Sequence, residues 1–389
     1  MSSRVCISGC GVVSAIGVGR RETLLSLKEG RRGLAPARYL PTTHKDLPLG
    51  EVKRSNAQLK ALLGIPESRV VSRTSFLAML AVREAMQEAG ELGVYRPAFI
   101  SGTTVGGMDI SEQMAPEERH PEQWDCGASS QAVADYFGCF SQVITPSTAC
   151  SSAANALLLG ARLIKAGRCD VVVAGGSECL SLFHLNGFRS LMIVDAEPCR
   201  PFDVTRAGLN LGEGAAYVVL ESEAHALARG AKPQAYLDGW GNACDAYHQT
   251  ASSPEGEGAF LAMTEALRRA GLKPADIGYI NAHGTGTPNN DESESHALQR
   301  LFGAQLPPVS STKGLTGHTT SASGSIEAVF CILALQNGFL PGNAGFSTPF
   351  EGGIVPIRES IPAPDVQHVL CNAFGFGGND TSLLISKAL

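Results

Sequence analysis

The chain has 389 residues, of which 44% are hydrophobic and 17% charged, so it has the composition of a globular protein and is long for a single core. A net charge of -6 argues against a general nucleic-acid binder, and the absence of a run of about 18 apolar residues argues against a membrane span. The first ten residues have no signal-peptide core and the eleven cysteines include no CxxC pair, which predicts a reducing, cytoplasmic location. The cysteines and histidines do not cluster at ligand spacings, so no metal site is expected.

Strand-like and helix-like segments alternate along the chain, which predicts an α/β fold. In the first part, strands are expected over 4–10, 98–102, 142–145, 170–175 and 215–220, with helices over 75–89 and 153–166. In the second part, strands are expected over 277–280, over 309–311 and up to residue 385, with a helix over 323–337. Both parts close with a glycine-rich turn and an apolar strand, which favours two duplicated halves, 1–230 and 231–389, although any α/β chain shows some such repetition.

A glycine-rich segment near the start is similar to a dinucleotide-binding turn. It contains Gly9, Gly11 and Gly17, but the third glycine of that motif falls on Ser14. The chain also contains neither a P-loop nor a GxSxG elbow. A nucleotide site at the first strand is therefore rejected.

Cys150 lies between a predicted strand and a predicted helix, in the segment Thr148-Ala-Cys-Ser-Ser152. A thiol at a helix start is close to free backbone N–H groups and to the positive end of the helix dipole. These groups favour the nucleophilic thiolate and can hold a developing oxyanion. Cys150 is thus a candidate nucleophile; the alternative is a buried structural cysteine, which is the better interpretation for most of the other ten.

Two further turns, each following a predicted strand, are rich in glycine and threonine and contain a histidine. His283 lies in the turn 281–288 and His318 in the turn 313–318. Functional groups gather beyond the carboxyl ends of strands in α/β sheets. A single histidine there is more often a hydrogen-bonded structural residue, but two on similar turns, together with a candidate nucleophile, favour a catalytic site.

These motifs together resemble the β-ketoacyl-acyl carrier protein synthases, the condensing enzymes with a Cys-His-His triad. The resemblance runs nearly from end to end and is carried by Ile7-Ser-Gly-Cys-Gly-Val-Val-Ser14, Thr148-Ala-Cys-Ser-Ser152, Pro201-Phe-Asp203, Leu211-Gly-Glu-Gly-Ala215, His283-Gly-Thr-Gly-Thr-Pro288, Lys313-Gly-Leu-Thr-Gly-His318 and Asn372-Ala-Phe-Gly-Phe-Gly-Gly378. It implies a thiolase-like fold of two βαβαβ-type halves in five αβαβα layers, assembled as a dimer.

The resemblance also implies a reaction. Cys150 would take an acyl chain from acyl carrier protein as a thioester, with the backbone N–H groups of Cys150 and Phe376 as the oxyanion hole. Malonyl-carrier protein would then lose carbon dioxide while His283 and His318 hydrogen-bond the enolate oxygen, and the carbanion would attack the thioester to give 3-oxoacyl-carrier protein. Lys313 would support this site by pairing with Glu327; the alternative for these two is a purely structural ion pair.

The same resemblance assigns the substrate pocket. Thr285 and Thr287 would hydrogen-bond the phosphopantetheine arm of the carrier, although threonines beside glycines also serve turns. Phe374, Phe376 and Val105 would line the acyl pocket; the alternative for Phe376 is a packing aromatic. No cofactor of the protein's own is implied, because the substrates arrive on the carrier.

An acidic carrier needs basic residues on the synthase. Arg69, Arg73 and Arg206 fall at matching positions, and the alternative is that they are merely solvated. Asp291 and Glu294 also match acidic positions of the family and are expected to hold their loop rather than to react.

Some positions depart from the family pattern and leave the pathway open. Ser321-Ala-Ser-Gly324 replaces Gly-Ala-Ala-Gly, Ala207-Gly-Leu209 replaces Asp-Gly-Phe, and the stretch between Gly107 and Cys150 is short. Fatty-acid, polyketide and aryl-polyene synthesis remain alternatives, as do a homodimer and a heterodimer with a related chain-length subunit. The chain could itself be such a non-catalytic partner, although it keeps the triad. A thiolase would need a second catalytic cysteine near its C-terminus.

Overall fold

The computed structural model describes residues 4–93, 96–120, 122 and 125–388, and most of its strands join one mixed sheet in the order β11-β10-β14-β15-β9-β1-β8-β7-β5-β6. The strands are β1 (Val5–Ser14), β2 (Gly17–Val18), β3 (Ala35–Pro36), β4 (Pro48–Leu49), β5 (Ala98–Gly102), β6 (Gln142–Ile144), β7 (Val171–Glu178), β8 (Gly214–Ser222), β9 (Ala235–Cys244), β10 (Tyr279–Asn281), β11 (Val309–Ser310), β12 (Phe339–Leu340), β13 (Ile361–Pro362), β14 (His368–Gly375) and β15 (Asn379–Lys387).

The helices complete the two halves. They are α1 (Arg20–Glu29), α2 (Asn56–Leu63), α3 (Arg73–Ala89), α4 (Met108–Gln113), α5 (Cys126–Phe137), α6 (Ser152–Lys165), α7 (Leu182–Ser190), α8 (Glu223–Ala228), α9 (Glu257–Ala270), α10 (Pro288–Phe302), α11 (Lys313–Thr316) and α12 (Ser323–Asn337). Within the described residues no helix is both long enough and apolar enough to cross a membrane.

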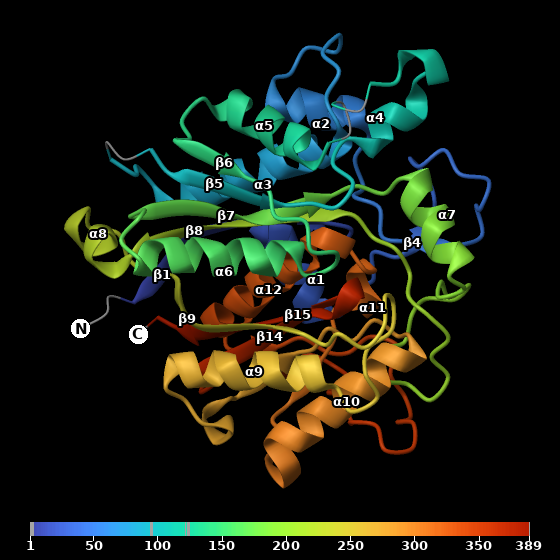
Figure 1. The fold of residues 1–389 in the computed structure, drawn as a ribbon, viewed down its shortest axis with the longest axis vertical. Helices are drawn as coiled ribbons and strands as arrows, with labels where there is room; N and C mark the ends of the chain where they lie inside the picture. Colours follow the sequence, from blue (N-terminus) through green and yellow to red (C-terminus); the bar gives the residue numbers. More distant parts are fainter. Residues whose placement is uncertain (1–3, 94–95, 121, 123–124, 389) are drawn as a thin grey trace.

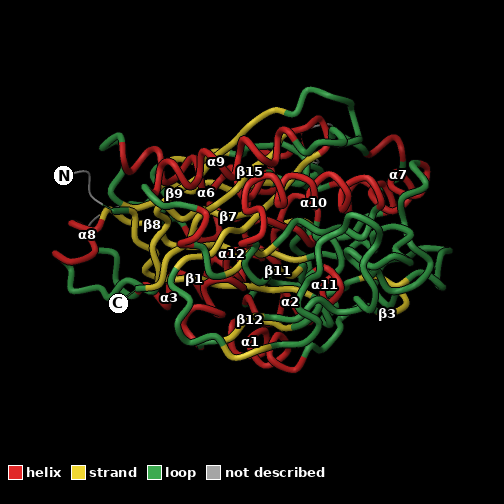
Figure 2. The backbone as a smooth tube through the Cα atoms, turned by 90° about the horizontal axis from the view of Figure 1, so that it is seen from below, coloured by secondary structure: helices red, strands yellow, loops and turns green. Residues whose placement is uncertain are grey.

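The elements stack in five layers (Figure 1). Helix α3 covers the outer face of β1 and β8, α6 and α12 lie in the middle, and α9 covers the outer face of β9 and β15. Figure 2 shows the strands running between these helical layers. The predicted α/β class and its αβαβα layers are confirmed.

Strand β8 is buried on both faces, which explains its apolar sequence. Ala216, Val218 and Leu220 face the core that contains α6 and α12, whereas Tyr217 and Val219 face the core beneath α3. A strand that is buried on both faces has no polar side to alternate with, so it is a continuous apolar run.

The first glycines have a packing role. Gly9 and Gly11 lie within β1, and an added Cβ at either would come within 2.2 Å and 2.1 Å of the carbonyl oxygens of Ala85 and Ala81 on α3. Glycine here lets a helix lie directly on a strand. The rejection of a nucleotide-binding turn at these glycines agrees with this geometry.

The two halves meet where β1 pairs with β9, at Cys6 and Ile7. The proposed boundary near Gly230 falls in the connection between α8 and β9. The assignment of 1–230 and 231–389 as separate units stays a prediction.

Candidate active site

Cys150 lies in a sharp turn at the start of α6. The strand β6 ends at Ile144, Ala149 has a positive φ of 52°, and Ser151 is the N-cap of α6. The thiol therefore lies one residue before the N-cap, at the strand-to-helix turn where the sequence places it. A left-handed residue costs energy, and a small alanine is one of the side chains that can bear it.

The environment of the thiol differs from the helix-start prediction. Burial raises the pKa of Cys150 to about 11, while the positive charge of Lys313 and the N–H groups of Phe376 and of Cys150 itself act in the opposite direction. Desolvation of the thiolate outweighs these charges and dipoles in the free protein. Because both N–H groups face the sulfur, they are well placed for an oxyanion that forms beside it.

His283 and His318 meet at the same site, with ring centroids 5.2 Å apart and the rings nearly perpendicular. Burial lowers the pKa of both imidazoles well below the ordinary value, with further lowering of each by Lys313. Both rings are therefore neutral at physiological pH, and each offers one N–H donor.

Lys313 controls which nitrogen of His283 carries its proton. Its ammonium group donates to the His283 carbonyl at 2.6 Å and lies 3.5 Å from Nδ1 of the same residue. An ammonium group can only donate, so Nδ1 is the acceptor and the proton of the ring is on Nε2. Glu327 balances this buried charge, with its Oε1 2.5 Å from Lys313 Nζ, as predicted from the sequence.

Two carboxylates hold the turn that carries His283. Glu294 accepts the backbone N–H groups of His283 at 2.9 Å and Gly284 at 2.8 Å. Asp291 accepts the N–H of Phe202 at 2.7 Å and that of Gly286 at 3.2 Å. Both residues therefore hold the loop, in the way the sequence suggested.

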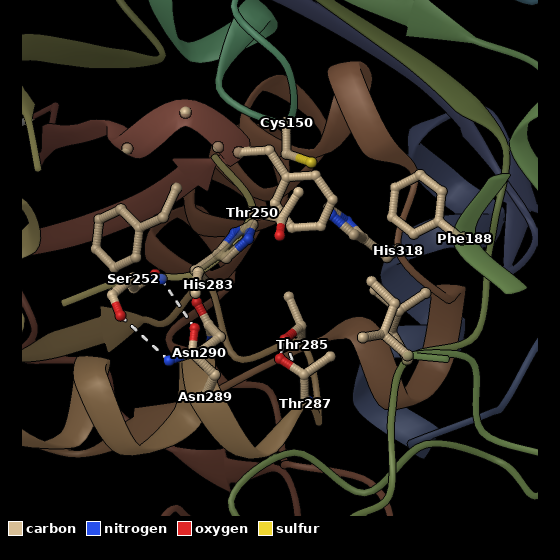
Figure 3. A pocket seen from close by; sticks show the side chains of 18 of the residues that line it. Cys150, Phe188, Thr250, Ser252, His283, Thr285, Thr287, Asn289, Asn290 and His318 are labelled. Atoms are coloured by element: carbon tan, nitrogen blue, oxygen red, sulfur yellow. Dashed lines mark hydrogen bonds between the residues drawn. The ribbon is translucent and has the colours of Figure 1, made fainter. Parts of the chain in front are cut away.

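These groups open into one cavity of about 340 Å³ (Figure 3). Cys150, His283 and His318 lie near one another in it, and Thr285 and Thr287 lie further from Cys150 with their hydroxyl oxygens 2.9 Å apart. The remaining lining residues are Phe188, Ile193, Leu209, Thr250, Ala251, Ser252, Pro288, Asn289, Asn290 and 374–378. A reactive thiol, two N–H donors and a mostly apolar wall thus converge on one tunnel.

The two serine departures from the family motif both serve buried carboxylates. Ser321 Oγ donates to Glu178 at 2.6 Å, and Thr103 and Thr104 bond the same carboxylate. Ser323 Oγ donates to Glu327 at 3.0 Å. Each added hydroxyl therefore has a hydrogen-bond partner, which a buried polar group requires.

Comparison with protein-family models matches the beta-ketoacyl synthase N-terminal domain to residues 2–226 and the beta-ketoacyl synthase C-terminal domain to residues 234–347. The chain belongs to the beta-ketoacyl synthase family. Among curated relatives, this synthase is 34% identical to nodulation protein E of Rhizobium meliloti strain 1021, covering 100% of both chains. It is 33% identical to 3-oxoacyl-[acyl-carrier-protein] synthase 2 of Synechocystis sp. PCC 6803, covering 99% of this chain and 98% of that one.

Solved structures place the synthase in the same fold. It superposes on the ishigamide ketosynthase/chain length factor with a TM-score of 0.91 and 30% identity over 100% of both chains. It superposes on one chain of the complex between a ketosynthase and its chain length factor from Xenorhabdus doucetiae, with a TM-score of 0.83 and 32% identity over 99% of this chain and 98% of that one. The expected thiolase-like fold of the ketosynthases is confirmed.

The structure corrects two of the three predicted docking arginines of the synthase. Arg73 is buried and pairs with Glu213 at 2.6 Å, and the side chain of Arg206 is 5% exposed and lies over the ring of Phe350. Neither guanidinium group is available to a partner. The match to basic positions of the family suggested a surface role, but Arg73 is held by an ion-pair partner that lies 140 residues away in the sequence. Arg69 is exposed, and its docking role stays a prediction.

Val105 is buried and does not line the cavity of the synthase, so its place in an acyl pocket stays a prediction. The ring centroids of Phe374 and His283 are 5.6 Å apart. The ring of Phe376 stacks on that of Phe188, with their centroids 5.7 Å apart. Sequence reasoning missed Phe188 and Glu178. Glu178 could have been noticed, because a carboxylate that ends an apolar strand needs buried partners. Within the described residues no cluster of histidine, cysteine or acidic side chains could hold a metal ion.

Proposed function

We propose that the protein catalyses the decarboxylative condensation of an acyl group, held as a thioester on Cys150, with a malonyl group on acyl carrier protein. The observation that carries this proposal is the convergence of Cys150, His283 and His318 on one tunnel, with the N–H of Phe376 at the sulfur. The similarity to the Synechocystis 3-oxoacyl-[acyl-carrier-protein] synthase 2 supports a carrier-bound substrate.

In the first half-reaction the Cys150 sulfur forms a bond to the acyl carbonyl carbon, and the carrier leaves with the thiol proton. The buried thiol is protonated at rest, because burial raises its pKa to about 11. The N–H groups of Cys150 and Phe376 stabilise the oxyanion of this step. In the transition state these two N–H groups replace the water that would otherwise solvate the negative oxygen.

In the second half-reaction the malonyl group loses carbon dioxide, and its thioester oxygen gains negative charge. Neutral imidazoles that each donate one N–H bond can stabilise this oxygen without first giving up a proton. The enolate carbon then attacks the acyl carbonyl and releases the Cys150 thiolate, which is reprotonated. Thr285 and Thr287 offer hydroxyl groups to the phosphopantetheine arm along the tunnel.

The assembly proposed is a dimer, with a second copy or with a chain length factor. Two solved relatives of at least 30% identity are titled as ketosynthase/chain length factor pairs. The intact triad supports the catalytic rather than the non-catalytic role for this chain. A thiolase is disfavoured because Cys371 is buried against the Gly324 carbonyl and does not line the tunnel.

The test is the mass of the acyl group trapped on Cys150. The protein is incubated with a series of acyl-carrier proteins, and the peptide that contains Cys150 is weighed. An acyl adduct on this peptide, transferred onward when malonyl-carrier protein is added, is the expected result. Absence of an adduct with every acyl-carrier protein, including those with chains from two carbons upward, contradicts the function and favours a non-catalytic partner.

The pH dependence of decarboxylation tests the neutral imidazoles. Because burial and Lys313 hold the pKa of His283 and His318 well below about 6.5, carbon dioxide release should not fall as the pH drops through that value. In the unfolded chain the same imidazoles bind protons below about 6.5, so the stability they contribute is present above that pH and decreases below it. Pre-steady-state decarboxylation and thermal denaturation, both measured between pH 8 and 5, check the two parts. A decarboxylation rate that follows a pKa near 6.5 contradicts the assignment.

Charge reversal at Arg69 tests docking. Arg69→Glu should raise the apparent KM for the carrier-bound substrate and leave kcat unchanged, because rim charges govern encounter more than chemistry. Arg268→Glu is a matched control, since the side chain of Arg268 is two-thirds exposed and lies in the last turn of α9. An unchanged KM in the Arg69 variant removes the docking role.

A further inference from the structure

Helix α7 contributes Phe188 to the lining of the tunnel, and few of its residues are buried. Only His184 and Leu185 among its residues are buried, and Phe183 is 58% exposed. At its C-terminal end, Phe188 lines the tunnel and stacks on Phe376 with an interplanar angle of 20°. One face of α7 packs on a small apolar cluster that includes Leu185, with Leu182 and Phe188 against it, and the polar contacts at the start of the helix add to this packing.

The N-terminus of α7 receives unusual support from another helix. Glu112, at the end of α4, accepts the N–H of Leu182 at 2.9 Å and the N–H of Phe183 at 2.7 Å. Ser181 accepts the N–H of His184 at 3.1 Å. These are the first three N–H groups of α7, which have no partner within the helix. A carboxylate at this end also complements the helix dipole.

Helix α4 is itself anchored to the body of the protein. Asp109, three residues before Glu112, accepts from Ser72 Oγ at 2.5 Å and from the N–H of Arg73 at 2.8 Å, at the start of α3. Residues three apart lie on the same side of a helix. The short helix α4 thus joins the N-termini of α3 and α7 through two carboxylates, across a cavity of about 230 Å³. Figure 1 shows α4 and α7 on the same side of the molecule.

We propose that Glu112 is a positioning residue for the catalytic thiol. By capping α7 it fixes Phe188, and through the Phe188–Phe376 stack it fixes the backbone N–H of Phe376 at the Cys150 sulfur. This inference depends on the proposed function for its catalytic consequence, but its structural consequence can be measured separately. Acyl transfer to Cys150 uses the Phe376 N–H, whereas decarboxylation uses the two imidazoles.

Hydrogen exchange tests the structural link without any substrate. In the full-length Glu112→Ala variant, amide exchange is expected to become faster over 182–191 and also over 374–378. Glu118→Ala is the matched control, because Glu118 is an exposed acid in the same segment, and it should change neither region. Faster exchange over 182–191 with no change over 374–378 overturns the proposal, since α7 would then move without the Phe376 loop.

The half-reactions test the catalytic consequence. Glu112→Ala should slow acylation of Cys150 on the order of tenfold, because a small displacement of a catalytic group is costly, and leave malonyl decarboxylation unchanged. Glu112→Gln keeps one acceptor oxygen for one of the two N–H groups and should recover part of the acylation rate, even if the alanine variant folds poorly. An equal fall of both half-reactions indicates general destabilisation and overturns the proposal. A wild-type protein that never acylates refutes the proposed function instead, and the exchange experiment then decides on Glu112 alone.

Discussion

Replacement of Cys150 by alanine abolishes the acyl-enzyme and lowers condensation by about four orders of magnitude or more, which is the expected size for loss of a covalent nucleophile. The cause is direct, because among the residues that the structure describes Cys150 is the one thiol that lines the tunnel. Decarboxylation of malonyl-carrier protein should survive, since its charge is stabilised by His283 and His318. Intact-mass analysis after incubation with acyl-carrier protein, together with carbon dioxide release, measures both effects.

Cys244 provides the control for the first expectation. It is the exposed cysteine of the free thiols, and its sulfur lies 3.7 Å from the Gly377 carbonyl near the tunnel. Cys244→Ser should keep both the adduct and condensation. If the acyl adduct persisted in Cys150→Ala but disappeared in Cys244→Ser, the nucleophile would be Cys244 rather than Cys150. That result would contradict the mechanism.

Replacement of His283 or His318 by alanine is the second large expectation. Each variant should lose malonyl decarboxylation on the order of 100- to 1000-fold, because each removes one preorganised N–H donor from a buried enolate oxygen. Acylation of Cys150 should change much less, since its oxyanion is held by backbone N–H groups. Single-turnover measurements of the two half-reactions separate these effects.

A third histidine serves as the comparison. His296 lies on α10, outside the tunnel, with its ring hydrogen-bonded to the Pro254 carbonyl at 2.7 Å. His296→Ala should retain both half-reactions. If His283→Ala and His318→Ala slowed acylation as strongly as decarboxylation, the two imidazoles would have to act on the thiol rather than on the enolate.

Much of the fold could be predicted because its elements follow local patterns. The strand over 98–102 and the helix over 323–337 have the predicted bounds, since each is an apolar segment ended by glycine or by a change of periodicity. The strand predicted over 277–280 lies instead at Tyr279–Asn281, where pairing with β14 decides the bounds. Pairing between strands that are far apart in the sequence cannot be predicted from a short stretch of residues.

The site shows the same division between local and distant causes. The turn that carries Cys150 and the two histidine turns were predicted from short motifs, and the structure brings them to one tunnel. The raised pKa of Cys150 was not predicted from the sequence. Burial, which depends on the whole fold, raises this pKa by more than the N–H groups beside the thiol lower it. The burial of Arg73 depends on Glu213, and the place of Phe188 depends on Glu112; both partners are distant in sequence.

The middle layer has a consequence for synthesis of the chain on the ribosome. Apolar residues of β1 and β8 in the first half, such as Val12 and Val218, share one core with Ile326 and Phe330 of α12. These strands are made long before α12, so the nascent first half exposes an apolar face until residues 323–337 emerge. The core around β1 and β8 is therefore completed only when α12 has been made.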